Sequence, residues 1–158
     1  MAANALSLSK EERQTIEYAA ILHDIGKLAI PDSILNKSDT LTDEEWKMIR
    51  KHPVTGFNML KGIDFIQEAS KLVLYHHERY DGKGYPQGLK EDAIPVGARL
   101  IAVADAFDAM TTEHTYSVAR SKKDAFMELY RYAGSQFDPA AVKAFSSGFA
   151  RSLLSGKI

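Results

Sequence analysis

Apolar residues recur every three or four positions along most of the chain, and no convincing alternation of apolar and polar residues appears. Helix-capping pairs mark several predicted helix starts: Ser9 with Glu12, Thr42 with Glu45, Asp64 with Gln67, and Ser121 with Asp124. We expect the first helix to run towards Leu28 and the third to reach His76 and His77.

Two prolines mark further helix starts. Pro95 is placed as a first-turn proline before "VGARLIAVADAFDAM", and Asp138-Pro139 begins the last helix, with Val142 and Phe145 facing inward. The 158 residues contain no repeat, linker or low-complexity tract and suit one domain. The prediction is an all-α domain, a helical bundle of about six or seven helices.

Composition narrows the functional classes. The net charge of -1 and the lack of a basic stripe argue against DNA or RNA as a partner. There is no cysteine, so any metal must be held by nitrogen and oxygen ligands. No signal peptide and no apolar run of membrane-spanning length is present. We therefore expect a cytoplasmic protein, or a cytoplasmic piece of one, without membrane contact from this segment.

The candidate chemistry lies on a few polar residues of apolar helices: His23, Asp24, His52, His76, His77 and Asp105. Each has an ordinary explanation. A single helical histidine is usually a core or surface residue, the histidine pair suits a helix end, and Asp105 could pair with Arg99. We expect the helix around Asp105 to be buried, where a carboxylate needs a partner or a metal. Together the six side chains predict a metal site between facing helices.

Spacing refines this prediction. Adjacent residues of a helix point about 100° apart, so a histidine pair can serve two metals or two edges of one site. Asp24 has two oxygens and is the natural bridge. Lys27 shares a helix face with His23, so it could bind a substrate phosphate oxygen and assist the leaving group, or simply pair with Asp24 as an exposed lysine. Cations held by His and Asp favour a metal-dependent phosphohydrolase.

The motifs "HDIGK", "KHPVTG", "HHERYDGKGYP" and "AVADAFDAM" resemble, in this order, the HD-GYP subgroup of HD-domain phosphohydrolases. The resemblance extends from about Ala19 to Phe145. It implies a phosphodiesterase that hydrolyses cyclic di-GMP to linear pGpG or GMP in bacterial second-messenger signalling. It also implies two or three metal ions, most often iron or manganese, with zinc as a possibility.

The resemblance also implies roles for individual residues. Asp24 would bridge, with His52, His76 and His77 serving one metal and His23 and Asp105 the other, and Lys27 would assist the phosphate. The loop residues Asp81, Gly82, Gly84, Tyr85 and Pro86 would shape the edge of the site or a partner surface, with a purely structural turn as an equal alternative.

Two departures from the family pattern matter. No histidine precedes His23, although the family has an upstream ligand helix. We therefore expect residues 1–158 to form a single HD-GYP-like domain without its N-terminal helix or helices, an upstream sensory domain or a third metal. An Arg-Pro-Tyr usually follows "DAM", but this chain has His114-Thr115-Tyr116-Ser117. His114 could donate one hydrogen bond to substrate, or be an ordinary loop histidine.

Three functions stay open at this point: a cyclic di-GMP phosphodiesterase, a catalytically impaired regulatory module, or a hydrolase of another cyclic dinucleotide or phosphate ester. The expected partners are the cyclic dinucleotide and diguanylate cyclase domains. A homodimer is a further possibility, since the apolar segments Leu6–Leu8 and Leu153–Leu154 could meet either a second chain or a missing helix.

Overall fold

The computed structural model describes residues 8–113 and 119–154, and helices make up most of that part. The α-helices are α1 (Lys10–Leu22), α2 (Asp32–Leu35), α3 (Asp43–Ile49), α4 (His52–Leu60), α5 (Gln67–Tyr75), α6 (Val96–Thr111), α7 (Lys122–Arg131) and α8 (Pro139–Leu154). Three short 3₁₀ helices join them: η2 (Ile25–Ala29), η3 (Asp64–Ile66) and η4 (Glu91–Ala93). The described residues contain one isolated bridge, Ala133 with Phe137, and no strand, so the all-α prediction is confirmed.

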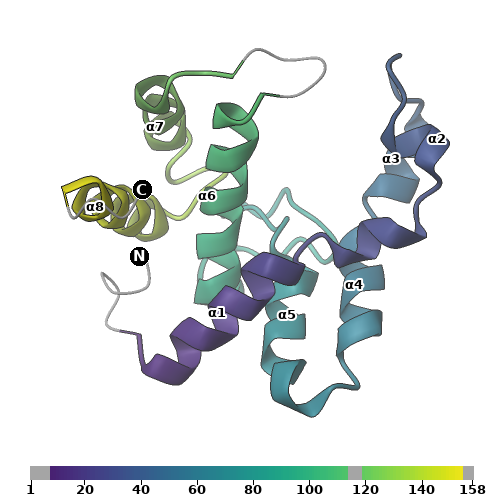
Figure 1. The fold of residues 1–158 in the computed structure, drawn as a ribbon, viewed down its shortest axis with the longest axis horizontal. Coiled ribbons are helices and arrows are strands. Elements are labelled where there is room, and N and C mark those ends of the chain that lie inside the picture. The colour runs from purple at the N-terminus through teal and green to yellow at the C-terminus, as the bar shows by residue number, and fades with distance from the viewer. Residues whose placement is uncertain (1–7, 114–118, 155–158) are drawn as a thin grey trace.

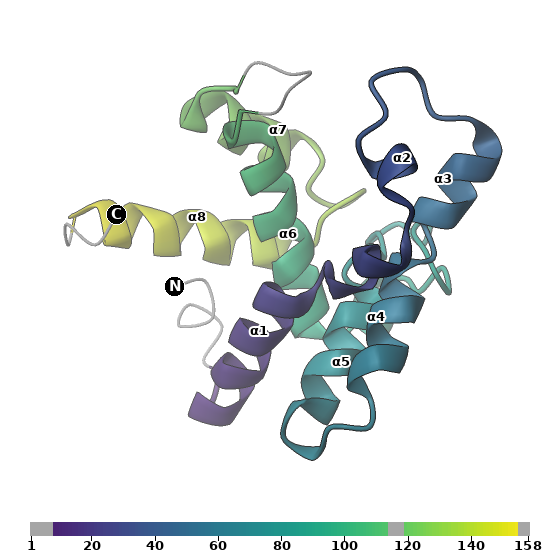
Figure 2. The same ribbon diagram turned by 45° about the vertical axis from the view of Figure 1, so that its right-hand side comes forward.

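Helix α6 is the centre of the fold. It packs against α1 and α5 on one side and against α7 and α8 on the other (Figure 1). Helices α2 and α3 form an arm that extends beyond α4 and away from α7 and α8 (Figure 2). The arrangement brings the end of α1, the start of α4 and the end of α5 together near the middle of α6 (Figures 1 and 2).

Most of the predicted helix starts are confirmed. Capping boxes open α1 at Ser9 and α3 at Thr42, and the Ser121 hydroxyl accepts a hydrogen bond from the backbone N–H of Asp124. Pro95 is the N-cap of α6, one position earlier than expected. The capping role predicted for Asp64 is wrong: this residue opens a 3₁₀ turn, and α5 begins at Gln67 without a side-chain cap.

The first helix is shorter than predicted. It ends at Leu22 instead of continuing towards Leu28, because the backbone leaves the α-helical conformation at Asp24 and tightens into η2. Helix η2 packs closely against α4. Gly26 permits this approach, since a Cβ at that position would overlap the carbonyl oxygen of His52. The break places the side chains of His23 and Asp24 at a helix end instead of along a continuous helix.

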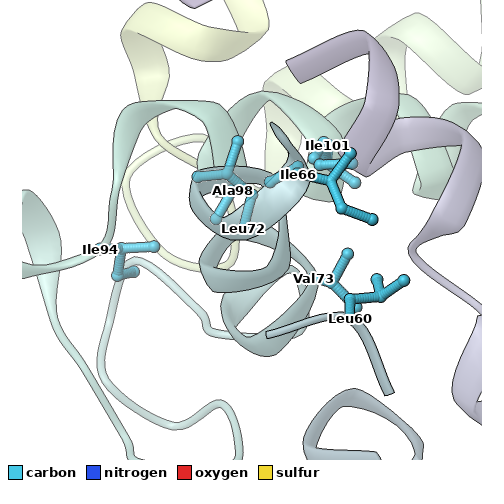
Figure 3. Packing of buried hydrophobic residues seen from close by; sticks show 9 residues of the cluster. Leu60, Ile66, Leu72, Val73, Ile94, Ala98 and Ile101 are labelled. Atoms are coloured by element: carbon cyan, nitrogen blue, oxygen red, sulfur yellow. The ribbon is translucent and has the colours of Figure 1, made fainter. Parts of the chain in front are cut away.

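Two apolar clusters hold the helices together. The first lies among α1, α4, α5 and α6 and includes Leu60, Ile66, Leu72, Val73, Ile94, Ala98 and Ile101 (Figure 3). The second lies among α6, α7 and α8, and is built around Leu100, Val103, Phe107, Leu129 and Val142, with Phe145 packed against it. The inward orientation predicted for Val142 and Phe145 is confirmed. Because α6 supplies side chains to both clusters, its position is fixed from two sides.

Candidate metal centre

Four side chains converge where α1, α4 and α5 meet. The ligand atoms of Asp24, His52, His76 and His77 all lie within 4.8 Å of one another, and we call these residues the quartet. Asp24 follows the C-cap of α1, His52 is the first residue of α4, and His76 is the C-cap of α5. His52 and His76 are each only 1% exposed. The structure therefore brings together one of the two ligand sets predicted from the sequence.

Backbone carbonyls orient two of these imidazoles. Nδ1 of His52 lies 2.7 Å from the carbonyl oxygen of Ile49, and Nδ1 of His76 lies 2.7 Å from that of Val73. A carbonyl oxygen only accepts, so Nδ1 must carry the proton in both rings, and this assignment leaves each Nε2 with a free lone pair. Both Nε2 atoms point into the quartet, 3.3 Å apart. Two converging lone pairs repel unless a cation lies between them, so the donor set fits a metal ion.

The protonation states agree with this fit. Burial lowers the pKa of His76 to about 3, and burial together with the neighbouring His52 lowers that of His77 to about 4. Burial also lowers the pKa of His52. All three rings are therefore neutral at pH 7, which is the form that binds metal. His76 does lie at the end of α5, as the helix-end explanation expected. Its ring is neutral, however, so a favourable interaction of a charged histidine with the helix dipole does not explain its position.

The second predicted ligand set lies on the other side of Asp24. Nε2 of His23 is 3.4 Å from Oδ2 of Asp24 and 3.6 Å from Oδ1 of Asp105. Nζ of Lys27 is 2.7 Å from the same Oδ2, whereas Oδ1 of Asp24 is 3.3 Å from Nε2 of His52. Asp24 thus presents one oxygen to each side, as a bridging carboxylate would. Lys27 does pair with Asp24, which was the alternative explanation for this residue.

Charged neighbours decide the direction of the pKa shifts of Asp24, Asp105 and His23. Burial is the largest single influence on Asp24 and opposes its ionisation, but the hydrogen bond from Lys27 and the charges of Lys27, His23 and His52 together outweigh it, so the pKa of Asp24 is lowered. For Asp105, burial is again the largest single influence, but the hydrogen bond with His23 and the charges of the neighbouring histidines together outweigh it, and its pKa is lowered too. The same hydrogen bond raises the pKa of His23. Both carboxylates are therefore ionised at neutral pH and available to a cation.

Asp105 differs from the sequence prediction in two respects. It does not pair with Arg99, whose guanidinium instead binds Asp92 at 2.9 Å and Asp138 at 3.0 Å. It is also not enclosed, since its side chain is 33% exposed. The reason is its place on α6, where it faces a pocket of about 580 Å³ that Ala20, His23, Asp24, Lys27 and Asp108 also line. The second side of the centre thus opens to a space large enough for a ligand.

A family model described as HD domain matches residues 1–141. The chain belongs to the HD domain family. The expected likeness to its HD-GYP group is confirmed as well.

The matches to named relatives cover most of this HD domain. It is 46% identical over 153 residues to the cyclic di-GMP phosphodiesterase response regulator RpfG of Xanthomonas campestris, covering 96% of this chain and 40% of that protein. It is 37% identical over 143 residues to the 3'3'-cGAMP-specific phosphodiesterase 2 of Vibrio cholerae, covering 89% of this chain and 27% of that protein. The HD domain therefore spans less than half the length of these curated relatives.

A solved structure confirms the fold. The crystal structure of a cyclic GMP-AMP specific phosphodiesterase from Vibrio cholerae superposes with a TM-score of 0.73 at 19% identity. The match covers 94% of this HD domain and 41% of that chain. The helical arrangement described above is thus also that of a known phosphodiesterase.

The "DGKGYP" loop is folded back over the end of α5. Gly84 lies so close to the chain below it that a Cβ would overlap the backbone nitrogen of Arg79 and lie 2.6 Å from Cα of Glu78. The N–H of Tyr85 donates to the carbonyl oxygen of His77 at 3.2 Å, and the Tyr85 ring stacks on the His77 ring. Tyr85 is joined to Pro86 by a cis peptide bond. This half of the loop therefore lies against His77, beside the quartet.

The other half of the loop has structural contacts. The Asp81 carboxylate accepts two hydrogen bonds from the Arg79 guanidinium, at 3.1 and 2.8 Å, and this partner lowers the pKa of Asp81 to about 2. Arg79 also donates to Gln136, in the connection between α7 and α8. Gly82 has a φ of 79°, in the left-handed region. For Asp81 and Gly82, these contacts fit the predicted structural turn better than a role at the edge of the site.

Glu78 is a residue whose role the sequence analysis did not predict. Its side chain is buried, and its carboxylate accepts hydrogen bonds from the backbone N–H groups of Gln87 at 2.7 Å, Gly88 at 3.1 Å and Leu89 at 3.0 Å. It therefore holds the returning end of the loop. The only available signal was an acidic residue directly after two histidines, which by itself does not distinguish a structural anchor from a further ligand.

Some predictions concern parts that the structure does not describe. His114 lies outside the described residues, and so do Leu6 and the side chains of Leu153 and Leu154. Within the described residues, no helix is both long and apolar enough to cross a membrane.

Proposed function

We propose that this HD domain is a metal-dependent phosphodiesterase that hydrolyses cyclic di-GMP to linear pGpG, GMP or both. The observation that carries the proposal is the position of Asp24. One of its oxygens faces His52 in the quartet, and the other faces His23 and Lys27. A carboxylate between two groups of donors suits two divalent cations, for which iron or manganese is the first choice and zinc the alternative.

The proposed ligands follow from this geometry. His52, His76 and His77 would hold one cation together with Asp24, and His23 and Asp105 would hold the second, again with Asp24. When bound, the cations supply Lewis acidity, neutralise phosphate charge and lower the pKa of a water molecule for attack on phosphorus. The second position has fewer protein donors in the described part of the chain, so substrate oxygens and water would complete it.

The chain's own residues would position the phosphodiester and move the proton. Lys27 lines the pocket beside Asp24 and Asp105, and its side chain is 42% exposed. Its ammonium group would bind a non-bridging phosphate oxygen and donate a proton to the leaving ribose oxygen as the P–O bond breaks. A phosphate drawn to Lys27 would weaken the ion pair between Lys27 and Asp24, which frees Oδ2 of Asp24 for its proposed ligand role.

The substrate proposal rests on the relatives. The relative from Xanthomonas campestris is named for cyclic di-GMP, and the less similar one from Vibrio cholerae for 3'3'-cGAMP. Cyclic di-GMP is therefore our first choice, and the mixed dinucleotide is the comparison substrate. Contacts with diguanylate cyclase domains or with a second copy of the chain stay predictions.

The test is hydrolysis by the purified chain loaded with Mn²⁺ or Fe²⁺, with linear and mononucleotide products separated by anion-exchange chromatography. Asp24→Asn keeps the size of the side chain but removes the bridging charge, and we expect it to lower turnover by at least about a hundredfold. Asp39→Asn is the matched control, because Asp39 is exposed and its side chain has no hydrogen bond or ion pair in the described part of the chain.

Each outcome is informative. Product formation that is lost in Asp24→Asn and kept in Asp39→Asn supports the proposal. Hydrolysis of 3'3'-cGAMP but not of cyclic di-GMP would replace the substrate and keep the reaction. A metal-loaded chain that turns over neither dinucleotide would overturn the proposal in favour of a regulatory module.

A further inference from the structure

The four histidines around the metal centre are not oriented in the same way. In His23, His52 and His76, Nδ1 lies 2.7 Å from the backbone carbonyl oxygen of the residue three positions earlier. In the described part of the chain, no hydrogen bond reaches either ring nitrogen of His77. Metal-binding histidines almost always use the second ring nitrogen to fix the tautomer and the plane of the ring. Something else must hold the His77 ring.

An aromatic ring takes this place. The Tyr85 ring stacks on the His77 imidazole, with centroids 4.9 Å apart and planes inclined by 28°. The backbone N–H of Tyr85 also donates to the carbonyl oxygen of His77, which ties the two residues together. On its other sides the His77 ring meets His76 and His52, with centroids at 4.0 and 4.9 Å. Stacking thus confines the imidazole plane where no hydrogen bond does.

A cation completes the stack. The guanidinium carbon of Arg50 lies over the Tyr85 ring, 5.6 Å from its centroid. In the described residues, the Arg50 side chain has no salt bridge and no hydrogen bond, which leaves its guanidinium available for the contact with the Tyr85 ring. Arg50 is also the C-cap of α3. The chain of contacts therefore runs from the arm formed by α2 and α3, through Arg50 and Tyr85, to a member of the quartet.

We propose that Tyr85 and Arg50 are positioning residues that hold the His77 imidazole in its ligating orientation. The proposal rests on the metal-binding role of the quartet given above. It assigns to the tyrosine of the "DGKGYP" loop a task in the metal centre without direct contact with substrate. It also assigns Arg50, which the sequence analysis did not single out, to the same task.

The test measures metal affinity and ligand geometry, not turnover. The metal-free chain is titrated with Co²⁺, whose visible absorption reports the ligand geometry at the same time as occupancy. Arg50→Ala removes the cation, which we expect to weaken Co²⁺ binding about two- to fivefold. Arg50→Lys keeps a cation and is expected to retain wild-type affinity within about a factor of two. Tyr85→Leu removes the stacked ring and should weaken binding roughly tenfold and alter the absorption bands, whereas Tyr85→Phe should do neither.

Two comparisons separate positioning from other effects. Lys51→Ala removes an exposed positive charge that is one residue closer to His52, and it should leave binding unchanged. Arg50→Ala added to Tyr85→Leu should weaken binding no further, because Arg50 acts only through the ring. Circular dichroism of each metal-free variant checks that the helices are formed, and Arg50 is exposed enough for its substitution to leave folding intact.

The outcomes distinguish this proposal from the one it rests on. If the wild-type chain binds no Co²⁺, the proposed metal centre fails. If the wild type binds but folded Arg50→Ala and Tyr85→Leu match it in affinity and absorption, the positioning role fails and the metal centre stands. Equal losses in Lys51→Ala and Arg50→Ala would reduce the Arg50 effect to general charge and also overturn its role.

Discussion

Replacement of Glu78 by glutamine should destabilise the chain through the loop that is folded back over the end of α5. The Glu78 carboxylate accepts three backbone hydrogen bonds, two on Oε1 from Gln87 and Gly88 and one on Oε2 from Leu89. In the better of its two orientations, the side-chain oxygen of the glutamine still accepts the hydrogen bonds from Gln87 and Gly88. Its NH₂ group then faces the N–H of Leu89, so one bond is lost and two donors oppose each other.

The expected size of this loss follows from the burial of the site. Glu78 is only 4% exposed, so water does not readily replace the missing acceptor. An unsatisfied buried donor costs about 1–3 kcal/mol, and we expect Glu78→Gln to lower the free energy of unfolding by about 2 kcal/mol. With a urea m-value of about 2 kcal/mol/M, the unfolding midpoint would fall by about 1 M without a change in m.

The assay is urea unfolding of metal-free protein followed by circular dichroism, so that metal binding does not contribute. Glu68→Gln is the matched control on α5, because the Glu68 side chain is 69% exposed and, among the described residues, pairs only with Lys71. We expect it to change the free energy of unfolding by less than about 0.5 kcal/mol. Equal midpoints for Glu78→Gln and Glu68→Gln would refute the anchoring role of Glu78.

Three further predictions concern the metal centre and its loop. The stability of the metal-free chain should rise as the pH increases from about 3 to 6.5, because the lowered pKa values of His76 and His77 make the unfolded chain bind more protons in that range; urea unfolding at several pH values measures the slope. Gly84→Ala should disrupt the loop and weaken Co²⁺ binding by at least about tenfold, whereas Gly62→Ala, with nothing within 4 Å of its Cβ, should bind like the wild type. Asp105→Asn should reduce Mn²⁺ binding measured by calorimetry from about two equivalents to about one, and a loss of both would contradict independent filling of the quartet.

The candidate ligands were predictable from residue type and local spacing, whereas their grouping into two sets was implied by the family resemblance. His52, His76 and His77 were expected to share one cation with Asp24, and the structure brings these four side chains within ligand distance of one another. Polar residues at the ends of otherwise apolar helices have few ordinary places in a core. A metal site was therefore the economical explanation even before the helices were placed.

Other features were not predictable because they depend on contacts between distant segments. The early end of the first helix is followed by the close packing of η2 on α4, where Gly26 lies against the carbonyl of His52. The exposure of Asp105 depends on the pocket between α1 and α6, and not on the apolar residues beside it in the sequence. The roles of Glu78 and Arg50 arise from where the loop lies after folding. Local spacing contains no signal for any of these contacts.

The most direct test of the central claim is the metal content of the chain purified without added metal. Elemental mass spectrometry would be applied to the wild type, Asp24→Ala and the exposed-carboxylate control Asp39→Ala. We predict about two equivalents of iron or manganese in the wild type and the control, and less than about a tenth of an equivalent in Asp24→Ala. A wild-type chain without bound metal, or an Asp24→Ala variant with undiminished metal, would contradict the assignment of this site as a metal centre.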